Sequence, residues 1–397
     1  MIGLNFTPSR TMALDRLTHF APLAGRHYET GRNTDAGPDH ANSVSYLSPY
    51  VRHRIITEHE IIAEVLRHHR LPVAEKFVQE VLWRTYWKGW MEMRPSVWRR
   101  FLNERDRHRT TFHDHHAIAC AEKGQTGIEG FDDWARELVE TGYLHNHARM
   151  WFASIWIFTL RLPWALGADF FLRHLLDADA ASNTLSWRWV AGLQTVGKTY
   201  LATTENIAKF TNGRFAPKGL ATEAISLTEP AVEPAGDLRQ PTRHDPSQPS
   251  LLLVTHEDMH PESIFSSAYD FRSVLVAADD ALLWGDRARQ FATKGATEMT
   301  TRAAAHFDCP THSITALDAE TLVTSAHAAG VRQIIAPYAP VGPVADAIAD
   351  LALVLAQQGI TVVTIRREWD SRFWPNAKKG FFNFKERMPQ LLSESGL

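Results

Sequence analysis

The pattern of apolar and polar positions divides the chain into two halves. Residues 50–210 carry apolar side chains at helical spacing, most clearly in the run 74–90, AEKFVQEVLWRTYWKGW. Residues 140–163 behave similarly. Long helical patterns with irregular links predict an all-α domain, and its last helix is expected to end near Asn212.

After residue 250 the period changes from helical to strand-like. Short runs rich in aliphatic and β-branched residues occupy 251–256, 273–278, 333–338 and 361–366. They alternate with helical segments such as 343–358, and strands separated by helices predict a parallel sheet in an α/β domain. The first run ends in polar residues before a predicted helix, at the edge where an open sheet usually forms its ligand crevice.

A proline-rich segment joins the two halves. Residues 216–249 contain six prolines in a polar setting with few aromatic residues, which is typical of a linker. The pattern therefore predicts a helical domain at 1–215, a linker at 216–249 and an α/β domain at 250–397.

The composition is that of a soluble globular protein. Of the 397 residues, 44% are hydrophobic and 22% are charged, and no apolar stretch is long enough to cross a membrane. The first residues lack the apolar core of a signal peptide, and Cys120 and Cys309 form no metal-type pair. We expect a reduced, cytoplasmic protein that acts as a monomer and does not contact membranes.

The formal net charge of −3 does not by itself indicate nucleic-acid binding, but basic residues gather between Trp83 and Thr110. They are Arg84, Lys88, Arg94, Arg99, Arg100, Arg105, Arg107 and Arg109. On one face they could neutralise DNA phosphates. A solvated helix face is the more common explanation of such a run.

Two further motifs fit known functional patterns, but their sequence context does not support a functional site. Residues 192–199, GLQTVGKT, fit the phosphate-loop pattern, but that loop needs a strand before it and a helix after it. The preceding residues continue a tryptophan-rich helical region, so we interpret the match as chance rather than as a nucleoside-triphosphate site. The cluster 113–116, HDHH, has no spaced second pair of ligands, and we interpret it as a surface loop without a metal.

Four other segments hold the informative polar residues. Residues 28–33 (YETGRN) precede 45–50 (SYLSPY), where serine hydroxyls and free N–H groups before a helix can bind a diphosphate, although a simple helix cap explains them too. In the second segment, Glu80 and Arg84 lie at i and i+4 on a predicted helix and could merely pair with each other.

The third and fourth segments are harder to explain as core. Asn146 and Met150 lie on one face of a predicted helix. Two acids, one amide and two tryptophans then fall within thirteen residues: Asp177, Asp179, Asn183, Trp187 and Trp189. Buried carboxylates need partners, and Arg84 and Arg149 are the natural ones.

Taken in this order, the four segments resemble the FAD-binding domain of DNA photolyases and cryptochromes over roughly residues 15–200. The α/β half, with its ending KGFFNFK at 379–385, is similar to the antenna-type domain that precedes the FAD domain in that family. The resemblance thus implies a circularly permuted order, joined by the linker at 216–249.

The resemblance implies FAD as cofactor and leaves an antenna chromophore open. It assigns contacts with FAD to Tyr28, Ser45, Tyr46, Leu47, Ser48, Arg84, Arg149, Asp177, Asp179 and Asn183. Arg149 and Asp177 are expected to form an ion pair, and Asn183 to face flavin N5.

The same resemblance implies a pocket for damaged DNA. It places Glu80, Trp83, Asn146, Met150 and Trp189 around a flipped pyrimidine dimer. Trp187 and Trp164 match two members of an electron relay, with Glu80 and Asn183 as the other catalytic residues, while the third relay tryptophan, expected near 110–112, is missing.

The implied activity is light-driven repair of cyclobutane pyrimidine dimers by electron transfer from excited reduced FAD. A cryptochrome-like photoreceptor without repair is the alternative. Relatives that repair (6-4) photoproducts carry histidines at the positions matching Asn146 and Met150, so the cyclobutane dimer is the expected substrate.

Overall fold

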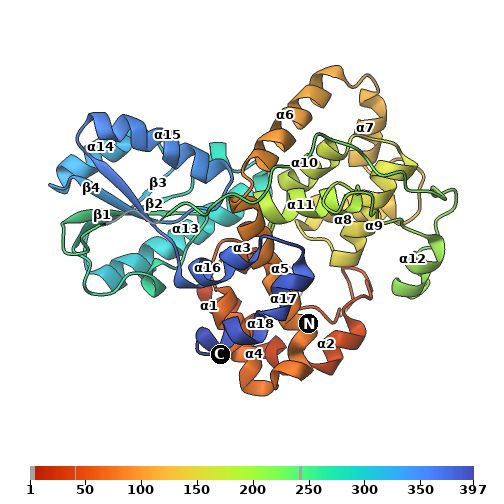
Figure 1. The fold of residues 1–397 in the computed structure, drawn as a ribbon, viewed down its shortest axis with the longest axis horizontal. Helices are drawn as coiled ribbons and strands as arrows, with labels where there is room; N and C mark the ends of the chain where they lie inside the picture. Colours follow the sequence, from red (N-terminus) through yellow and green to blue (C-terminus); the bar gives the residue numbers. More distant parts are fainter. Residues whose placement is uncertain (1–4, 41, 241–243) are drawn as a thin grey trace.

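The computed structural model describes residues 5–40, 42–240 and 244–397, with a helical half beside a sheet-containing half (Figure 1). The helices of the first half are α1 (Arg10–Phe20), α2 (Arg26–Gly31), α3 (Ser48–Arg52), α4 (Glu58–His68), α5 (Leu71–Glu92), α6 (Ser96–Thr111), α7 (His115–Glu122), α8 (Phe131–Thr141), α9 (Asn146–Ser154), α10 (Trp164–His174), α11 (Ala180–Val190) and α12 (Thr204–Phe210). An all-α first half was predicted, and the structure confirms it.

The second half alternates strands and helices. Its elements are β1 (Ser250–Thr255), β2 (Phe271–Ala277), α13 (Asp286–Phe307), β3 (Thr311–Ile314), α14 (Ala319–Ala328), β4 (Gln333–Pro337), α15 (Pro343–Gln357), β5 (Thr361–Ile365), α16 (Glu368–Phe373), α17 (Phe381–Glu386) and α18 (Met388–Glu394). The strands form one parallel sheet in the order β3-β2-β1-β4-β5. The predicted parallel α/β architecture is therefore confirmed, but β3 is an additional edge strand of four partly exposed residues.

Local chemistry sets the ends of the helices that matter for the site. Helix α5 has Pro72 in its first turn and ends shortly before Pro95, which disfavours helical backbone at the residue before it. Gly142 ends α8 with a φ of 71°, a left-handed conformation that glycine adopts at little cost. The pattern at 140–163 is therefore divided among the end of α8, helix α9 and a π-helical turn at Ile155–Thr159.

The inner strands β1, β2 and β4 are buried on both faces because each face meets helices. In β1, Leu251 and Leu253 pack with α14 and α15, whereas Leu252 and Val254 join the core shared by α13 and the helical half. Because successive side chains point to opposite faces of the sheet, one strand contributes to two separate cores. The core on the α13 face continues into the core of the helical half.

The last three helices leave the sheet and pack against the helical half, as Figure 1 shows for α16, α17 and α18 beside α3, α4 and α5. At Gly89 of α5, an added Cβ would come within 2.8 Å of Trp374, so only glycine permits this close approach. The domain boundaries at 215 and 250 stay a prediction, and the carboxy-terminal helices share their core with the helical half.

The proline-rich segment has no helix or strand between residues 211 and 240, and it is held against the helical half. Glu229 pairs with Arg188, Ser96 Oγ donates to Glu233, and the Gly236 N–H donates to Met93 O at 2.9 Å. Residues 241–243 lie outside the described residues.

Buried ion pairs fix how the two halves dock. Arg52 binds both carboxylate oxygens of Glu257 at 2.8 and 2.7 Å, and Arg54 binds both oxygens of Asp370 at 2.7 Å. These side chains are at most 8% exposed. Because a buried charge without its partner is costly, the docking is specified by pairing as well as by apolar contact.

Candidate functional site

Two arginine–aspartate pairs lie at the centre of the helical half. Arg149 on α9 binds Asp177 through both guanidinium nitrogens, at 2.9 and 2.8 Å, and Arg84 on α5 binds Asp179. The ion pair predicted between Arg149 and Asp177 is therefore present. Arg84 also donates to Asp177 O at 3.3 Å, so both pairs belong to one cluster.

The second aspartate has two roles. Asp179 caps α11 by accepting a hydrogen bond from the Ser182 N–H at 2.7 Å, and it pairs with Arg84 at the same time. Burial alone would raise the pKa of Asp179, but Arg84, Lys88 and Arg52 bring it below its ordinary value. The same balance of burial against Arg149 lowers the pKa of Asp177. Both acids are thus held as carboxylates.

Lys88 is a basic residue of this cluster that the sequence did not single out for the site. It is 2% exposed, its Nζ has no hydrogen-bond partner among the described residues, and burial followed by Arg54 lowers its pKa. It lies near Asp179 and Glu257, so it connects the site electrostatically to the loop after β1.

The loop at Ser45–Ser48 joins the same cluster. Tyr46 has a φ of 53°, and the Leu47 N–H donates to Ser45 Oγ at 3.4 Å, which shapes a tight turn before α3. The Ser48 hydroxyl is a hydrogen-bonding neighbour of Asp177. Tyr46 and Leu47 differ in exposure, since Leu47 is buried and Tyr46 is half-buried.

Tyr143 connects this loop to α9. Its ring centroid lies 5.1 Å from that of Tyr46, and the Arg149 guanidinium lies 5.5 Å from the Tyr143 ring. Burial raises the pKa of Tyr143, so its phenol stays protonated. The aromatic character of the position was visible in the sequence, but its contact with Arg149 was not.

Helix α11 presents unsatisfied polar atoms beside these pairs. Asn183 Nδ2 donates to Ala168 O at 2.8 Å, which fixes the amide. Ser182 Oγ and Trp187 Nε1 are buried and have no partner among the described residues. Buried polar atoms are usually paired, so such atoms in a cluster of arginines, carboxylates and hydroxyls fit a polar, phosphate-bearing cofactor such as FAD.

Glu80 does not pair with Arg84. Its carboxylate instead accepts from Arg32 Nη1 at 2.6 Å, and burial raises its pKa while Arg32 opposes that rise. Tyr28 lies next to this pair, packed edge-on against Phe77 with ring centroids 5.1 Å apart. The structure thus places Tyr28 in the Glu80 neighbourhood.

Trp83, one turn along α5 from Glu80, is half-buried. Phe381 of α17 stacks on it with ring centroids 3.6 Å apart and planes at 11°. One face of Trp83, which was predicted to line the lesion pocket, is therefore covered by helix α17. The two residues are almost 300 positions apart, so the sequence pattern could not show this contact.

The other predicted lesion residues lie on α9 and α11. Asn146 is exposed at the start of α9, and Met150 is half-buried one turn later. Trp189 is half-buried and stacks on Tyr200, with centroids 5.7 Å apart. Tyr200 is a second aromatic neighbour that the sequence did not single out.

The two histidines beside Asn146 are engaged elsewhere. His145 caps α9, and burial lowers its pKa to about 4. His147 Nδ1 donates to Asn33 O (2.8 Å), the ring stacks on Trp151, and burial lowers its pKa as well. Both imidazoles are therefore neutral near pH 7, and neither is a ready proton donor to a ligand beside Asn146.

The two predicted relay residues meet the same helix. A Cβ at Gly167 would come within 2.3 Å of the Trp187 ring, so Trp187 of α11 packs against α10 at a position one turn from Trp164. Trp164 donates to Glu104 and packs against Phe101, with ring centroids 5.8 Å apart.

The aromatic contacts continue from Phe101. Its ring lies 5.3 Å from that of Trp98, which stacks on the partly exposed Trp284 at 5.6 Å. The structure thus supplies tryptophans beyond Trp164, although none lies near 110–112.

Two sequence motifs have plain structural explanations. Residues 192–199 form turns directly after α11, so a helix rather than a strand precedes them, as expected for a chance match. The interpretation of 113–116 as a loop was wrong for its second half: His115 and His116 begin α7, because Asp114 caps that helix by accepting from the Ala117 N–H.

The basic run between Trp83 and Thr110 is largely engaged within the protein. Arg109 pairs with Asp169, Arg100 pairs with Glu233, and Lys88 is buried. In the described part of the chain, no group of three or more possible metal-ligating side chains is found, and no helix is long and apolar enough to cross a membrane.

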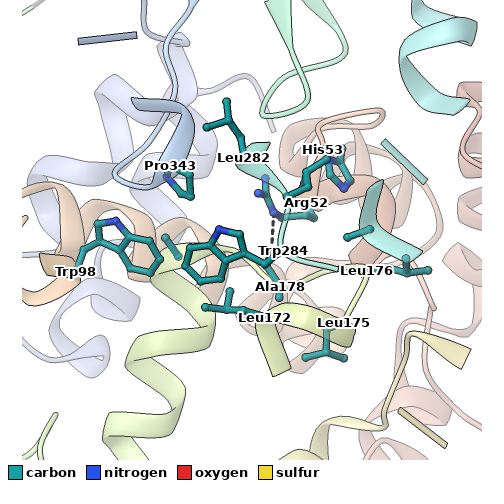
Figure 2. A pocket seen from close by; sticks show the side chains of 13 residues that line it. Arg52, His53, Trp98, Leu172, Leu175, Leu176, Ala178, Leu282, Trp284 and Pro343 are labelled. Atoms are coloured by element: carbon teal, nitrogen blue, oxygen red, sulfur yellow. Dashed lines mark hydrogen bonds between the residues drawn. The ribbon is translucent and has the colours of Figure 1, made fainter. Parts of the chain in front are cut away.

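The edge of the sheet predicted to hold a crevice faces the helical half. Figure 2 shows a small cavity there, lined by Arg52 and His53 from α3 and the turn after it, with Trp98, Trp284 and Pro343. Its volume is about 40 Å³, enough for a few water molecules. Arg52 is held beside it by donating from Nε to Ala178 O at 2.9 Å.

Comparison with known proteins also indicates a FAD-binding domain in the helical half. Residues 77–219 match the family described as the FAD binding domain of DNA photolyase. A deoxyribodipyrimidine photo-lyase of Streptomyces griseus is 34% identical over 169 residues, which are 42% of this chain and 35% of that protein.

Two further similarities fall in the same range. A deoxyribodipyrimidine photo-lyase of Agrobacterium fabrum is 31% identical over 190 residues, or 47% of this chain and 39% of that protein. The crystal structure of a bacterial class III photolyase from Agrobacterium tumefaciens covers 52% of this chain and 43% of its own, at 28% identity and a TM-score of 0.44. The chain thus spans less than two fifths of the length of the two curated relatives.

Proposed function

Because residues 77–219 are a FAD-binding domain of the DNA photolyase family, we propose that this protein repairs cyclobutane pyrimidine dimers in DNA with light. The observation that supports this most is that one matched stretch contains both the aspartates paired with Arg84 and Arg149 and the lesion-side residues Glu80 and Trp83. Bound FAD would supply the excitable electron donor, and the protein supplies its position and the recognition of the lesion.

One group of the proposed site residues holds the cofactor, and a second group carries electrons to it. Arg84, Arg149, Asp177 and Asp179 hold the cofactor with Tyr28, the loop Ser45–Ser48 and Asn183. Buried carboxylates kept ionised by half-buried arginines give a rigid frame, and a frame that needs no rearrangement favours catalysis. Trp187 and Trp164 carry electrons toward the cofactor through the helical half.

The lesion side is formed by α5, α9 and α11. Glu80, held by Arg32, offers its carboxyl to the carbonyl and imide edge of a flipped pyrimidine. Its raised pKa favours a shared proton, which would stabilise negative charge arriving on the base. Asn146 hydrogen-bonds the second pyrimidine, and Trp83, Met150 and Trp189 supply apolar contacts.

We expect repair of the cyclobutane dimer and no repair of the (6-4) photoproduct. The latter requires a proton donor near Asn146, whereas His145 and His147 are neutral and packed away from it. Illuminating the reduced protein with oligonucleotides that carry each lesion, followed by chromatography, measures both activities.

Repair of the (6-4) product alone would contradict the pocket assignment. Repair of neither lesion by a protein that holds FAD would move the protein to the photoreceptor class.

The purified protein is expected to bind FAD non-covalently and to be yellow, because the donor set of the site fits a diphosphate and a flavin ring. Absorbance in the flavin band, on the order of 450 nm, measures this. A folded, colourless preparation that does not take up added FAD would refute the cofactor assignment.

We also propose that the order of the domains is inverted relative to the family, with the segment 216–249 as the new connection. The FAD-binding match precedes the parallel sheet in this chain, which supports the inversion. Damaged DNA is the proposed partner, and the protein is proposed to act on it as a cytoplasmic monomer.

A further inference from the structure

Phe382 is an aromatic side chain in an unusual place. It is 79% exposed, and among the described residues no other phenylalanine, tyrosine or tryptophan is exposed to this degree. Keeping an aromatic ring in water forgoes the free energy of its burial. A single exposed apolar residue needs no explanation by itself, but this one lies in a segment that is anchored by hydrogen bonds and carries two exposed lysines.

The segment that carries Phe382 is anchored to α5 and to Arg94 just after it. Tyr86 Oη donates to Lys379 O at 2.8 Å, and Arg94 donates to Lys378 O at 2.9 Å. Phe381 is 6% exposed and lies flat on Trp83. Because the preceding residue is fixed on Trp83 in this way, Phe382 is held in water by an anchored segment rather than on a loose tail.

Two exposed lysines precede the ring along the chain. Lys378 and Lys379 are both exposed, and neither takes part in an ion pair within the described residues. Lys385, farther along α17, is already paired with Glu75 at 3.0 Å. The backbone carbonyls of the two lysines are bound by Arg94 and Tyr86, whereas their side chains are exposed to solvent in the same segment as Phe382.

We propose that residues 378–382 form a DNA-contact surface at the edge of the lesion pocket, an inference that rests on the proposed function. Lys378 and Lys379 bind backbone phosphates, and Phe382 stacks on a base left without its neighbour when the dimer leaves the duplex. The combination of free cations with one rigid exposed ring fits a polyanion with flat bases.

This surface differs from the basic run identified in the sequence. Arg100, Arg109 and Lys88 are engaged or buried, whereas Lys378 and Lys379 are exposed and form no ion pair with the part of the chain that the structure describes. The contact comes from the carboxy-terminal segment, because α17 packs on α5 and brings Phe381 onto Trp83.

The test measures DNA binding in the dark by fluorescence anisotropy, with the FAD-loaded protein and matched duplexes with and without one cyclobutane dimer. Phe382→Ala is expected to weaken binding of the dimer duplex on the order of tenfold, with little change for the undamaged duplex. Phe382→Trp retains a stacking ring and is expected to keep the affinity.

The lysine variant is expected to change DNA binding in a different way from Phe382→Ala. Replacing Lys378 and Lys379 together by alanine is expected to weaken both duplexes alike and to reduce the salt dependence of binding by about two released counterions. Leu353→Ala and Lys294→Ala change an exposed apolar and an exposed basic residue on α15 and α13, and should leave binding unchanged.

The outcomes separate this inference from the function it rests on. If the wild type prefers the dimer duplex and the variants at 378, 379 and 382 bind as it does, the contact surface is refuted and the repair function stands. If the wild type shows no preference for the dimer, both are refuted. Selective loss with Phe382→Ala and uniform loss with the lysine variant support the surface.

Discussion

Replacing Arg149 by alanine is expected to lower the free energy of unfolding by about 3–5 kcal/mol and to abolish retention of FAD. The reason is that Asp177, only 2% exposed, would lose both hydrogen bonds from its guanidinium partner and remain as an uncompensated charge. Urea denaturation followed by circular dichroism measures the first effect, and flavin absorbance after gel filtration measures the second.

A matched control is Arg67→Ala. Arg67 also pairs with a carboxylate, Glu64 at 3.0 Å, but its side chain is 77% exposed. An exposed pair contributes at most about 1 kcal/mol, so this variant should unfold nearly as the wild type does. Equal stability of the Arg149 variant and this control would contradict the role of the buried pair.

The loss caused by Arg149→Ala also depends on pH. In the wild type the pKa of Asp177 lies below its ordinary value, so the pair stabilises the fold above the pKa of an unfolded aspartate, about 4, and loses this contribution in more acid solution. Without Arg149 the carboxyl takes up a proton more easily. The difference between variant and wild type is therefore expected to be largest near pH 7 and to shrink toward pH 4.

Trp187→Phe is expected to abolish light-driven reduction of bound FAD while it spares dimer repair by chemically reduced protein. Trp187 is the proposed relay residue one turn after Asn183 on α11, and its ring packs against Gly167 of α10, one turn from Trp164. The repair electron moves toward the lesion and does not need this path. Absorbance of the flavin during illumination with a thiol reductant, compared with a repair assay after dithionite, separates the two.

Trp90→Phe is the control for this prediction. It changes another buried tryptophan of the helical half, one that packs against the Arg94 guanidinium at 4.3 Å, and it should photoreduce normally. If Trp187→Phe photoreduces at the wild-type rate, electrons reach the flavin by a route that does not include Trp187. We propose that the path continues beyond Trp164 through the contacting rings of Phe101, Trp98 and Trp284.

Local sequence was sufficient for much of the fold. Helical spacing along α5 and the apolar runs of β1, β2, β4 and β5 are properties of neighbouring residues, so their periods predicted the helical half and the parallel sheet. Three of these runs, β1, β2 and β4, are buried on both faces along most of their length, which makes them continuous apolar runs in the sequence. Strand β3 was missed because it is a short, partly exposed edge strand whose residues show no such run.

The sequence also placed the main charges of the site, within limits. It indicated that Asp177 and Asp179 need arginine partners, since a buried carboxylate is rarely left alone. The sequence could not show which residue each charged side chain of α5 pairs with. Glu80 and Arg84 lie one turn apart, yet the structure pairs Glu80 with Arg32 and Arg84 with Asp179. Pairing between distant segments depends on how helices pack, which spacing within one helix does not encode.

The carboxy-terminal helices show what only the tertiary structure decided. These helices come after the last strand, within the part of the sequence that was predicted to be the α/β domain. In the structure α16 and α17 nevertheless pack on α5, with Trp374 against Gly89 and Phe381 on Trp83. Periodicity tells which face of a helix is apolar and not which surface will cover it. That choice is made by complementary shapes and buried ion pairs, such as Arg54 with Asp370, which form only when distant segments meet.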